Sequence, residues 1–246
     1  MRTIVSIGLA LLLAIWQAPA QAAPDGFLDN SETPNAINFL PPPPTEDSPD
    51  FFRDVAVYWQ NATKKDEDRF RQASVDANFD DNWPTLFEKA FGLAINKKST
   101  PFTYELLNRA TADSSTAYDD VKAKYQRKRP FVYFNQPFGT TCQPAEEGSI
   151  RNSGSYPSGH VANAWLIALI LSEVSPGSQE AVMARGLDYG FSQVICGSHW
   201  TSDVEAARYL GSAVYARLHA DSEFMNLLAK SKQEIDQARA NPEGNQ

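Results

Sequence analysis

Beyond residue 50, apolar side chains recur along the chain at intervals of three, four or seven residues, the spacing of one face of an α-helix. One such stripe covers residues 102–129, and Pro130 is expected to end that helix. Residues 161–171 are apolar on nearly every side, which is typical of a helix buried in the core. Because strand-like alternation is not sustained anywhere, the pattern predicts an all-α fold.

Two further helices are predicted later in the chain. The first covers residues 179–194, after a turn at residues 176–177. The second begins with the capping-box signature of residues 202–205, and its apolar stripe continues to Leu218. Together these helices predict one helical domain over residues 51–246.

The first 23 residues have the organisation of a secretory signal peptide, with a positive charge at Arg2, an apolar run over residues 4–16 and small residues at 18–22. The alternative is a retained membrane anchor, but 13 apolar residues are too few to span a bilayer comfortably. We therefore expect a periplasmic or secreted protein. Residues 24–50 are polar and rich in proline, so they are expected to form an extended arm packed over the surface.

The chain has 22 basic and 30 acidic residues and a formal net charge of −8. This balance argues against nucleic acid or an anionic membrane as its partner. The two cysteines, Cys142 and Cys196, are expected to form one disulfide in an oxidising compartment. Closing a loop of about 50 residues stabilises a fold by roughly 3 to 5 kcal/mol. Two buried thiols are the alternative.

Two features are expected to have no chemical role. Residues 76–80 resemble the opening of a calcium-binding loop, but Asp81 stands where that loop needs glycine and Phe87 where it needs glutamate, so we expect a solvated turn. His219 lies late in a predicted helix, where the helix dipole stabilises a charged imidazole, so a structural role is expected. No spacing of histidines and carboxylates is typical of a metal site.

The other two histidines have more suggestive surroundings. His160 follows Ser158 and Gly159 at the start of the buried helix, where backbone N–H groups can bind an anion. His199 lies four residues before Asp203. That carboxylate can accept the N–H of one ring nitrogen and leave the other nitrogen to attack an electrophile.

Basic residues cluster immediately before Pro130. Lys124, Arg127 and Lys128 are expected to form a solvated helix face. Lys122 and Arg129 are seven residues apart, which is two turns along one helix face. Two long cationic side chains on one face can converge on a single phosphate.

Three ordered motifs contain these residues. They are Lys122-x6-Arg129-Pro130, Pro157-Ser158-Gly159-His160 and Ser192-Gln193-x5-His199-x3-Asp203. In this order they resemble the signature of the phosphatidic acid phosphatase type 2 superfamily, which also contains the vanadium-dependent haloperoxidases. The surrounding sequence is similar to that of the class A bacterial non-specific acid phosphatases. The resemblance implies an all-helical fold, a site without metal or cofactor, and export to the periplasm.

The resemblance also implies a role for each residue. His199 forms a phosphohistidine, Asp203 orients it, and His160 protonates the leaving alcohol. The phosphate oxygens are held by Lys122, Arg129, Ser158 and Gly159. Because His199 must be neutral and His160 charged, their surroundings must separate two pKa values that start near about 6.5, and an acidic rate optimum is expected.

Gln193 departs from the family pattern, which has an arginine at this position of the phosphate clamp. Losing one charge-assisted hydrogen bond, worth about 1.5 to 3 kcal/mol, slows a reaction roughly 10- to 100-fold. We therefore expect Gln193 to bind substrate with weakened activity. Arg151 and Lys124 are the candidates to replace the missing charge.

The expected partners are small soluble phosphate esters, and the sequence leaves open whether the protein forms a homo-oligomer. Two other functions remain open. The first is a non-catalytic phosphate-binding protein, which Gln193 favours, and the second is a vanadate-dependent haloperoxidase. A lipid phosphatase is disfavoured because no segment after the leader is long enough to span a membrane.

Overall fold

The computed structural model describes residues 25–63, 67–77 and 79–241, and every regular element in these ranges is helical. The predicted leader, residues 1–23, lies outside the described residues. The all-α fold is thus confirmed. The helices are α1 (Pro49–Thr63), α2 (Glu67–Ala77), α3 (Phe79–Phe91), α4 (Pro101–Tyr125), α5 (Pro130–Tyr133), α6 (Glu147–Ile150), α7 (Gly159–Val174), α8 (Gln179–Ile195), α9 (Thr201–Leu218) and α10 (Ser222–Ala240), with 3-10 turns η1 (Ala36–Asn38) and η2 (Pro176–Ser178).

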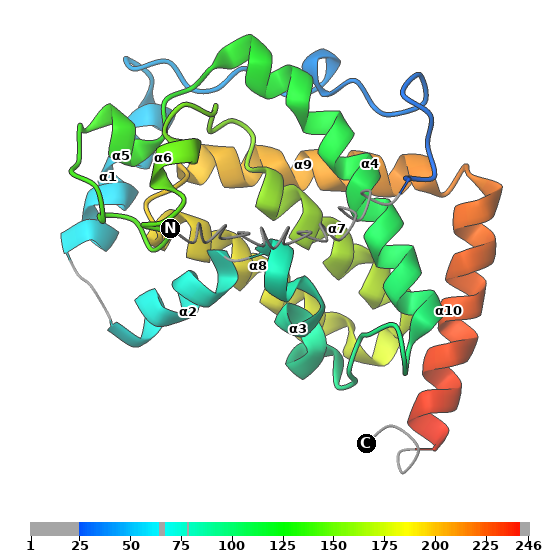
Figure 1. Ribbon diagram of the computed structural model, residues 1–246. Coiled ribbons are helices and arrows are strands. Elements are labelled where there is room, and N and C mark those ends of the chain that lie inside the picture. The colour runs from blue at the N-terminus through cyan, green and yellow to red at the C-terminus, as the bar shows by residue number, and fades with distance from the viewer. Residues whose placement is uncertain (1–24, 64–66, 78, 242–246) are drawn as a thin grey trace, which may run out of the picture.

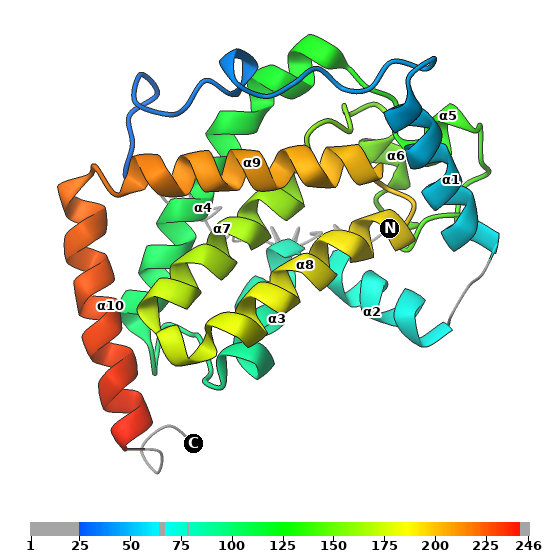
Figure 2. The same cartoon turned by 180° about the vertical axis from the view of Figure 1, so that it is seen from behind.

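The central helix is α7, which lies between α4 on one side and α8 and α9 on the other (Figures 1 and 2). Its sequence is apolar on all sides because all sides are covered, as predicted from residues 161–171. The close approach of α9 requires Gly211, where an added Cβ would lie 2.8 Å from the carbonyl oxygen of Ala162. The start of α7 is thereby packed closely against the middle of α9.

The end of α4 differs from the prediction. The helix stops at Tyr125 because Gln126 adopts a left-handed backbone with φ of 45°, and Arg129 has the extended conformation that a following proline favours. Lys122 and Arg129 therefore do not share a helix face, and that prediction was wrong. The chain instead reverses after α4 and brings Arg129 inward from a loop.

The start of α9 also differs in detail. Trp200 is the N-cap residue, and the side chain of Asp203 accepts the N–H of Trp200 at 2.8 Å. The capping box thus uses residues 200 and 203, two residues before the predicted one. Glu205, the predicted closing residue, forms an ion pair with Arg53 instead. His199 consequently lies immediately outside the helix, with its ring near the first turn.

Residues 25–48 pass over α4 and α9 as a mostly extended segment (Figure 2). Phe27, Ala36 and Leu40 are buried in the main core, and the Tyr156 hydroxyl donates to the carbonyl of Pro41 at 2.6 Å. The Arg109 guanidinium donates to the carbonyl of Gly26 at 2.9 Å. This segment is therefore fastened to the domain at several points along its length.

Two other expectations are decided by the structure. The disulfide between Cys142 and Cys196 is formed, which confirms that prediction. The prediction of a solvated turn at residues 76–80 was wrong for Asp76. This residue is buried at the end of α2 and accepts hydrogen bonds from Arg185, Ser192 and Gln72. No helix within the described ranges is long and apolar enough to cross a membrane.

Candidate active site

The His199 ring lies between a carboxylate and a guanidinium. Its Nδ1 is 3.4 Å from Oδ2 of Asp203, and its Nε2 is 2.9 Å from Nη1 of Arg129. Arginine can only donate, so Nε2 must be the accepting nitrogen and Nδ1 carries the hydrogen. The Nδ1 contact is long for a hydrogen bond, and catalytic contacts of this kind often tighten when substrate binds. The lone pair of the ring is therefore on Nε2, where it accepts the Arg129 N–H.

Burial determines the protonation state of His199. The ring is 3% exposed. Loss of hydration, reinforced by the positive charge of Arg129, lowers the pKa of His199 to about 3, although the Asp203 carboxylate acts in the opposite direction. The imidazole is thus neutral at any pH above about 4 and can act as a nucleophile in acid.

Asp203 is held by a second arginine that the sequence did not reveal. Nη1 of Arg127 donates to Oδ1 of Asp203 at 2.6 Å, and Nη2 donates to Oδ2 of Asp54 at 2.8 Å. Asp54 also accepts the backbone N–H of Ser202 at 2.9 Å. Burial alone would raise the pKa of Asp203, but Arg127 and the neighbouring donors lower it below its usual value. The carboxylate therefore stays charged beside His199.

The prediction that Arg127 lies on a solvated helix face was wrong. Its side chain is 9% exposed and bridges two fully buried carboxylates. The physical reason is the early end of α4, which leaves residues 126–129 as a loop that turns toward α9. Asp54 comes from α1, and its distance along the chain from residues 199–203 leaves no local pattern from which its role could be predicted.

Arg129 faces the same ring from the opposite side. Besides the contact with His199, its guanidinium donates to the carbonyls of Ser153 and Ser198 at 3.3 and 3.1 Å. Burial lowers the pKa of Arg129 to about 10. It therefore remains charged under all ordinary conditions, and its N–H groups are fixed toward the point where His199 presents Nε2.

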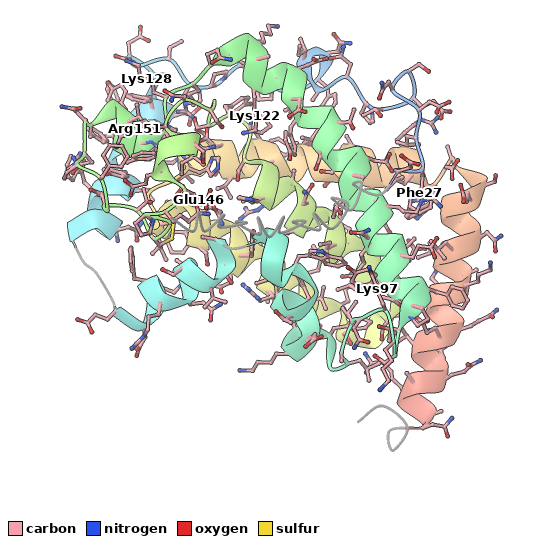
Figure 3. The ribbon with its side chains drawn as sticks, viewed as in Figure 1. Phe27, Lys97, Lys122, Lys128, Glu146 and Arg151 are labelled. Carbon is pink, nitrogen blue, oxygen red and sulfur yellow. A yellow bond between two sulfur atoms is a disulfide. The ribbon has the colours of Figure 1, made fainter. Side chains whose placement is uncertain are left out.

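Lys122 reaches the same region from α4 (Figure 3). Its Nζ donates to the carbonyl of Gly154 at 2.9 Å and lies 5.6 Å from the ring centre of Tyr118. Loss of hydration, followed by repulsion from Arg129, lowers the pKa of Lys122 to about 7. Lys122 on α4 and Arg129 in the loop after it are thus close enough for their charges to repel, although they belong to different elements.

The second motif forms the N-terminus of α7. Ser158 is its N-cap, and the Ser158 backbone N–H donates to the Asp203 carbonyl at 3.2 Å, which joins the second motif to the third. Gly159 packs directly against Tyr118, because an added Cβ would lie 2.7 Å from its ring. His160 is half-buried in the first turn of α7. This helix end carries a partial positive charge next to Asp203 and Lys122.

Gln193 lies on α8, next to His199. The side chain is fully buried, and among the residues that the structure describes neither its amide oxygen nor its amide nitrogen has a hydrogen-bond partner. The Gln193 carbonyl accepts the backbone N–H of His199 at 3.3 Å. Each buried donor or acceptor without a partner lowers the stability of a fold by about 1 to 3 kcal/mol. Such groups are typical of sites where a bound ligand supplies the missing hydrogen bonds.

Neither predicted substitute for the missing arginine reaches Gln193. The Arg151 guanidinium lies over the rings of Phe131 and Phe138, at 5.0 and 4.4 Å from their centres. The Lys124 ammonium lies 5.2 Å from the ring centre of Tyr125 on the exposed side of α4. Figure 3 shows Arg151 beside α5 and α6, apart from Lys122 on α4.

Two remaining expectations concern His219 and metals. His219 lies at the C-cap of α9, where its ring nitrogens contact the carbonyl of Tyr215 and the carboxylate of Glu173, both at 2.8 Å. It is remote in the chain from all three motifs and supports the packing of α9 on α7. Over residues 25–241, outside the undescribed gaps, no group of three or more histidine, cysteine, aspartate or glutamate side chains could hold a metal ion.

Known proteins resemble this chain over most of its length. The sequence profile of the PAP2 superfamily matches residues 106–224, a range that contains all three motifs. The non-specific acid phosphatase of Salmonella typhimurium is 39% identical over 230 residues, which cover 93% of this chain and 90% of that protein. This chain belongs to the PAP2 superfamily. Within the superfamily it groups with the non-specific acid phosphatases, so the resemblance stated from its motifs is confirmed.

Two other PAP2 relatives extend the comparison. The non-specific acid phosphatase of Providencia stuartii is 38% identical over 211 residues, 85% of this chain and 84% of that protein. The acid phosphatase of Zymomonas mobilis is 33% identical over 207 residues, 82% of this chain and 75% of that protein. The similarity therefore extends well beyond the motifs, into the elements that position them.

Proposed function

We propose that this PAP2 superfamily member is an exported acid phosphatase that hydrolyses small soluble phosphate monoesters through a phosphohistidine. The observation that supports the proposal best is the neutral His199 ring, placed between the carboxylate of Asp203 and the guanidinium of Arg129. Export rests on the signal-like leader of residues 1–23.

In the first step, His199 Nε2 attacks the phosphorus atom as the bond to the leaving oxygen breaks. The imidazole becomes positively charged, and Asp203, kept ionised by Arg127, stabilises that charge through Nδ1. His160 gives a proton to the leaving alkoxide, which departs as the alcohol. Arg129, Lys122 and the N-terminus of α7 surround the three equatorial oxygens.

In the second step, water attacks the phosphorus atom from the side that the alcohol has left. His160 accepts a proton from this water, the bond from phosphorus to Nε2 breaks, and His199 returns to its neutral form. Inorganic phosphate is the product. Before substrate binds, Arg129 contacts Nε2, so the incoming phosphate must take over that donor for attack to occur.

The charges favour catalysis in acid. Lys122, with a pKa of about 7, is positive below neutral pH and loses its charge above it, whereas His199 stays neutral down to about pH 4. Phosphate binding by Lys122 and nucleophilic attack by His199 therefore coincide in the acidic range. We propose that Gln193 contacts the phosphate through its amide and leaves activity below that of an enzyme with arginine there.

The alternative with a specific observation in its favour is a phosphate-binding protein without turnover, because Gln193 removes one charge from the clamp. Two intact histidines and a charged Asp203 argue against it, since binding alone requires none of them. A vanadate-dependent haloperoxidase is distinguished by halide oxidation in the presence of vanadate and peroxide.

The decisive experiment is hydrolysis of a chromogenic phosphate ester by the purified protein in EDTA. We expect turnover that is lost in His199→Ala and retained in His219→Gln, a matched change in a histidine outside the site. Rapid quenching in alkaline denaturant, in which a phosphohistidine persists, should trap the labelled phosphoryl group of the substrate on the wild type and none on His199→Ala. Phosphate binding without turnover would establish the alternative function.

A further inference from the structure

A cavity of about 930 Å³ adjoins the start of α7 and has no assigned role. It lies between the middle of α4, the start of α7, the side chain of Trp83 on α3, and residues 25–30 of the N-terminal segment. Its volume is in the range of cavities that bind small organic ligands. Its polar floor is formed by Asn108, Thr111, Ser115 and Asn163.

The cavity is connected to the candidate phosphate site by a chain of contacts. Lys122 lies against the Tyr118 ring, and the Tyr118 hydroxyl donates to Oγ of Ser115 at 3.3 Å. Nδ2 of Asn163 donates to the same oxygen at 3.4 Å. Ser115 and Lys122 are two turns apart on α4, so one face of this helix runs from the cavity to the cation.

The position of Asn163 relates the cavity to His160, the proposed proton donor. Asn163 follows His160 by three residues on α7, so their side chains lie on one side of the helix, about 5 to 6 Å apart at Cβ. His160 is the group proposed to protonate the leaving oxygen. A leaving group that receives its proton from His160 can therefore extend along α7 toward Asn163.

The amide of Asn163 is only half satisfied, because its nitrogen donates to Ser115 but its oxygen accepts no hydrogen bond from any described residue. The residue is 7% exposed, and among the described residues its amide oxygen has no hydrogen-bond donor. A buried acceptor without a donor costs about 1 to 3 kcal/mol, which a ligand hydroxyl in the adjoining cavity would remove. The other floor residues, Asn108 and Thr111, likewise offer amide and hydroxyl groups of the kind that bind sugar hydroxyls.

The charges around the cavity disfavour anions. Among the described residues, its lining includes the carboxylates of Asp25, Asp29 and Asp113 and contains no lysine or arginine. The Asp113 carboxylate accepts hydrogen bonds from the backbone N–H groups of Phe27 and Leu28, at 2.9 and 3.1 Å. The nearby Arg109 is paired with Glu223 at 2.7 Å and does not line the cavity. An uncharged, hydroxyl-rich group fits this surface best.

We infer that this cavity is the leaving-group subsite and that it selects phosphate esters of neutral polyhydroxylated alcohols, such as sugars. The inference rests on the proposed phosphatase function and adds the substrate class. Binding energy obtained in the cavity, away from the phosphate, would raise kcat/KM for sugar phosphates relative to esters with a small alcohol.

The test compares glucose 6-phosphate, methyl phosphate and 3-phosphoglycerate in the full-length protein and in Ala112→Trp, which places an indole in the cavity from the half-buried face of α4. We expect the wild type to prefer glucose 6-phosphate at least tenfold over the other two esters. Ala112→Trp should lower kcat/KM for glucose 6-phosphate at least tenfold and for methyl phosphate less than twofold. Ala229→Trp, an exposed alanine on α10, should change neither.

An equal effect of Ala112→Trp on both neutral esters, no effect on either, or a wild-type preference for 3-phosphoglycerate would overturn the inference. If the wild type hydrolyses none of the esters, the proposed function fails. The subsite is then tested by calorimetry, in which the dissociation constants of the same three esters should differ by the ratios given for kcat/KM. Should Ala112→Trp not fold, Asn108→Ala serves in its place, with an expected loss of about fivefold for glucose 6-phosphate alone.

Discussion

Arg127 donates to one oxygen of the Asp203 carboxylate at 2.6 Å, while the other oxygen of that carboxylate lies 3.4 Å from His199. The Arg127 guanidinium therefore influences His199 through the carboxylate of Asp203, which lies between them. Because Arg127 also contacts Asp54 on α1, a helix far from the three motifs takes part in setting the charge beside His199.

Replacing Arg127 with methionine should expose this coupling. Asp54 and Asp203 would be left buried without a counter-charge, so the free energy of unfolding should fall by about 3 to 5 kcal/mol. The pKa of Asp203 would rise, and the acidic limb of the pH profile of kcat should move to higher pH. Lys128→Met, a change in the exposed neighbour labelled in Figure 3, should alter stability by less than about 0.5 kcal/mol. An unchanged pH profile in a folded Arg127→Met protein would show that Arg127 is structural only.

Substitutions of Gln193 should separate its catalytic contribution from its packing. In Gln193→Arg the restored charge should raise kcat/KM for small phosphate esters about 10- to 100-fold. Gln193→Leu removes two unpartnered polar atoms at similar volume, so it should raise the free energy of unfolding by about 1 to 3 kcal/mol while lowering kcat/KM. If Gln193→Arg were no more active than the wild type, the site would have adapted to the neutral side chain.

Anion affinity should depend on the charge of Lys122. The pKa of Lys122, lowered to about 7, makes the side chain positive below neutral pH and neutral above it. Sulfate keeps its charge over this range, so its inhibition constant should rise about tenfold or more between pH 6 and pH 8. In Lys122→Met, sulfate should bind weakly at both pH values. Equal pH dependence in the two proteins would assign the titration to another group.

Stability in acid should depend on Glu173. Burial acts to raise the pKa of Glu173, but donors from Tyr215, Lys232 and His219 lower it to about 2. A depressed carboxyl pKa stabilises the fold above the unfolded value of about 4.5, and this stabilisation is lost as the pH falls from there toward 2. Glu173→Gln should therefore destabilise the protein more at pH 7 than at pH 2.5 in urea unfolding. Glu180→Gln, on an exposed position of α8, should show no such difference.

The helices α7 and α8 could be predicted from sequence because their apolar periodicity reflects burial directly. The three motifs likewise predicted residues that lie around His199, such as Arg129 and Asp203, because each motif lies within a short stretch of the sequence. The end of α4 could not be predicted, because position 126 has a left-handed backbone but is a glutamine, whereas glycine or asparagine usually marks such a helix end. That single backbone conformation decides whether Arg127 faces solvent or Asp203.

Long-range contacts account for the other omissions. Asp54 reaches the site only because α1 packs beside the start of α9, and Asp76 is buried only because α2 packs on α8. In both cases the sequence shows an aspartate with no local partner, and solvent exposure is the ordinary expectation for an unpaired carboxylate. The burial of these carboxylates depends on arginines supplied by distant parts of the chain.

The N-terminal segment limits where the chain can be cut without loss of core contacts. Phe27 stacks edge-on against Phe224 and lies under the Arg109 guanidinium, and Ala36 and Leu40 follow it into the same core. A peptidase that removed residues up to about 25 would leave these anchors in place, whereas cutting a few residues later would open the wall of the cavity beside Asn163 and expose aromatic surface. The position of any processing site is thus constrained by the folded domain as well as by the recognition sequence of the peptidase.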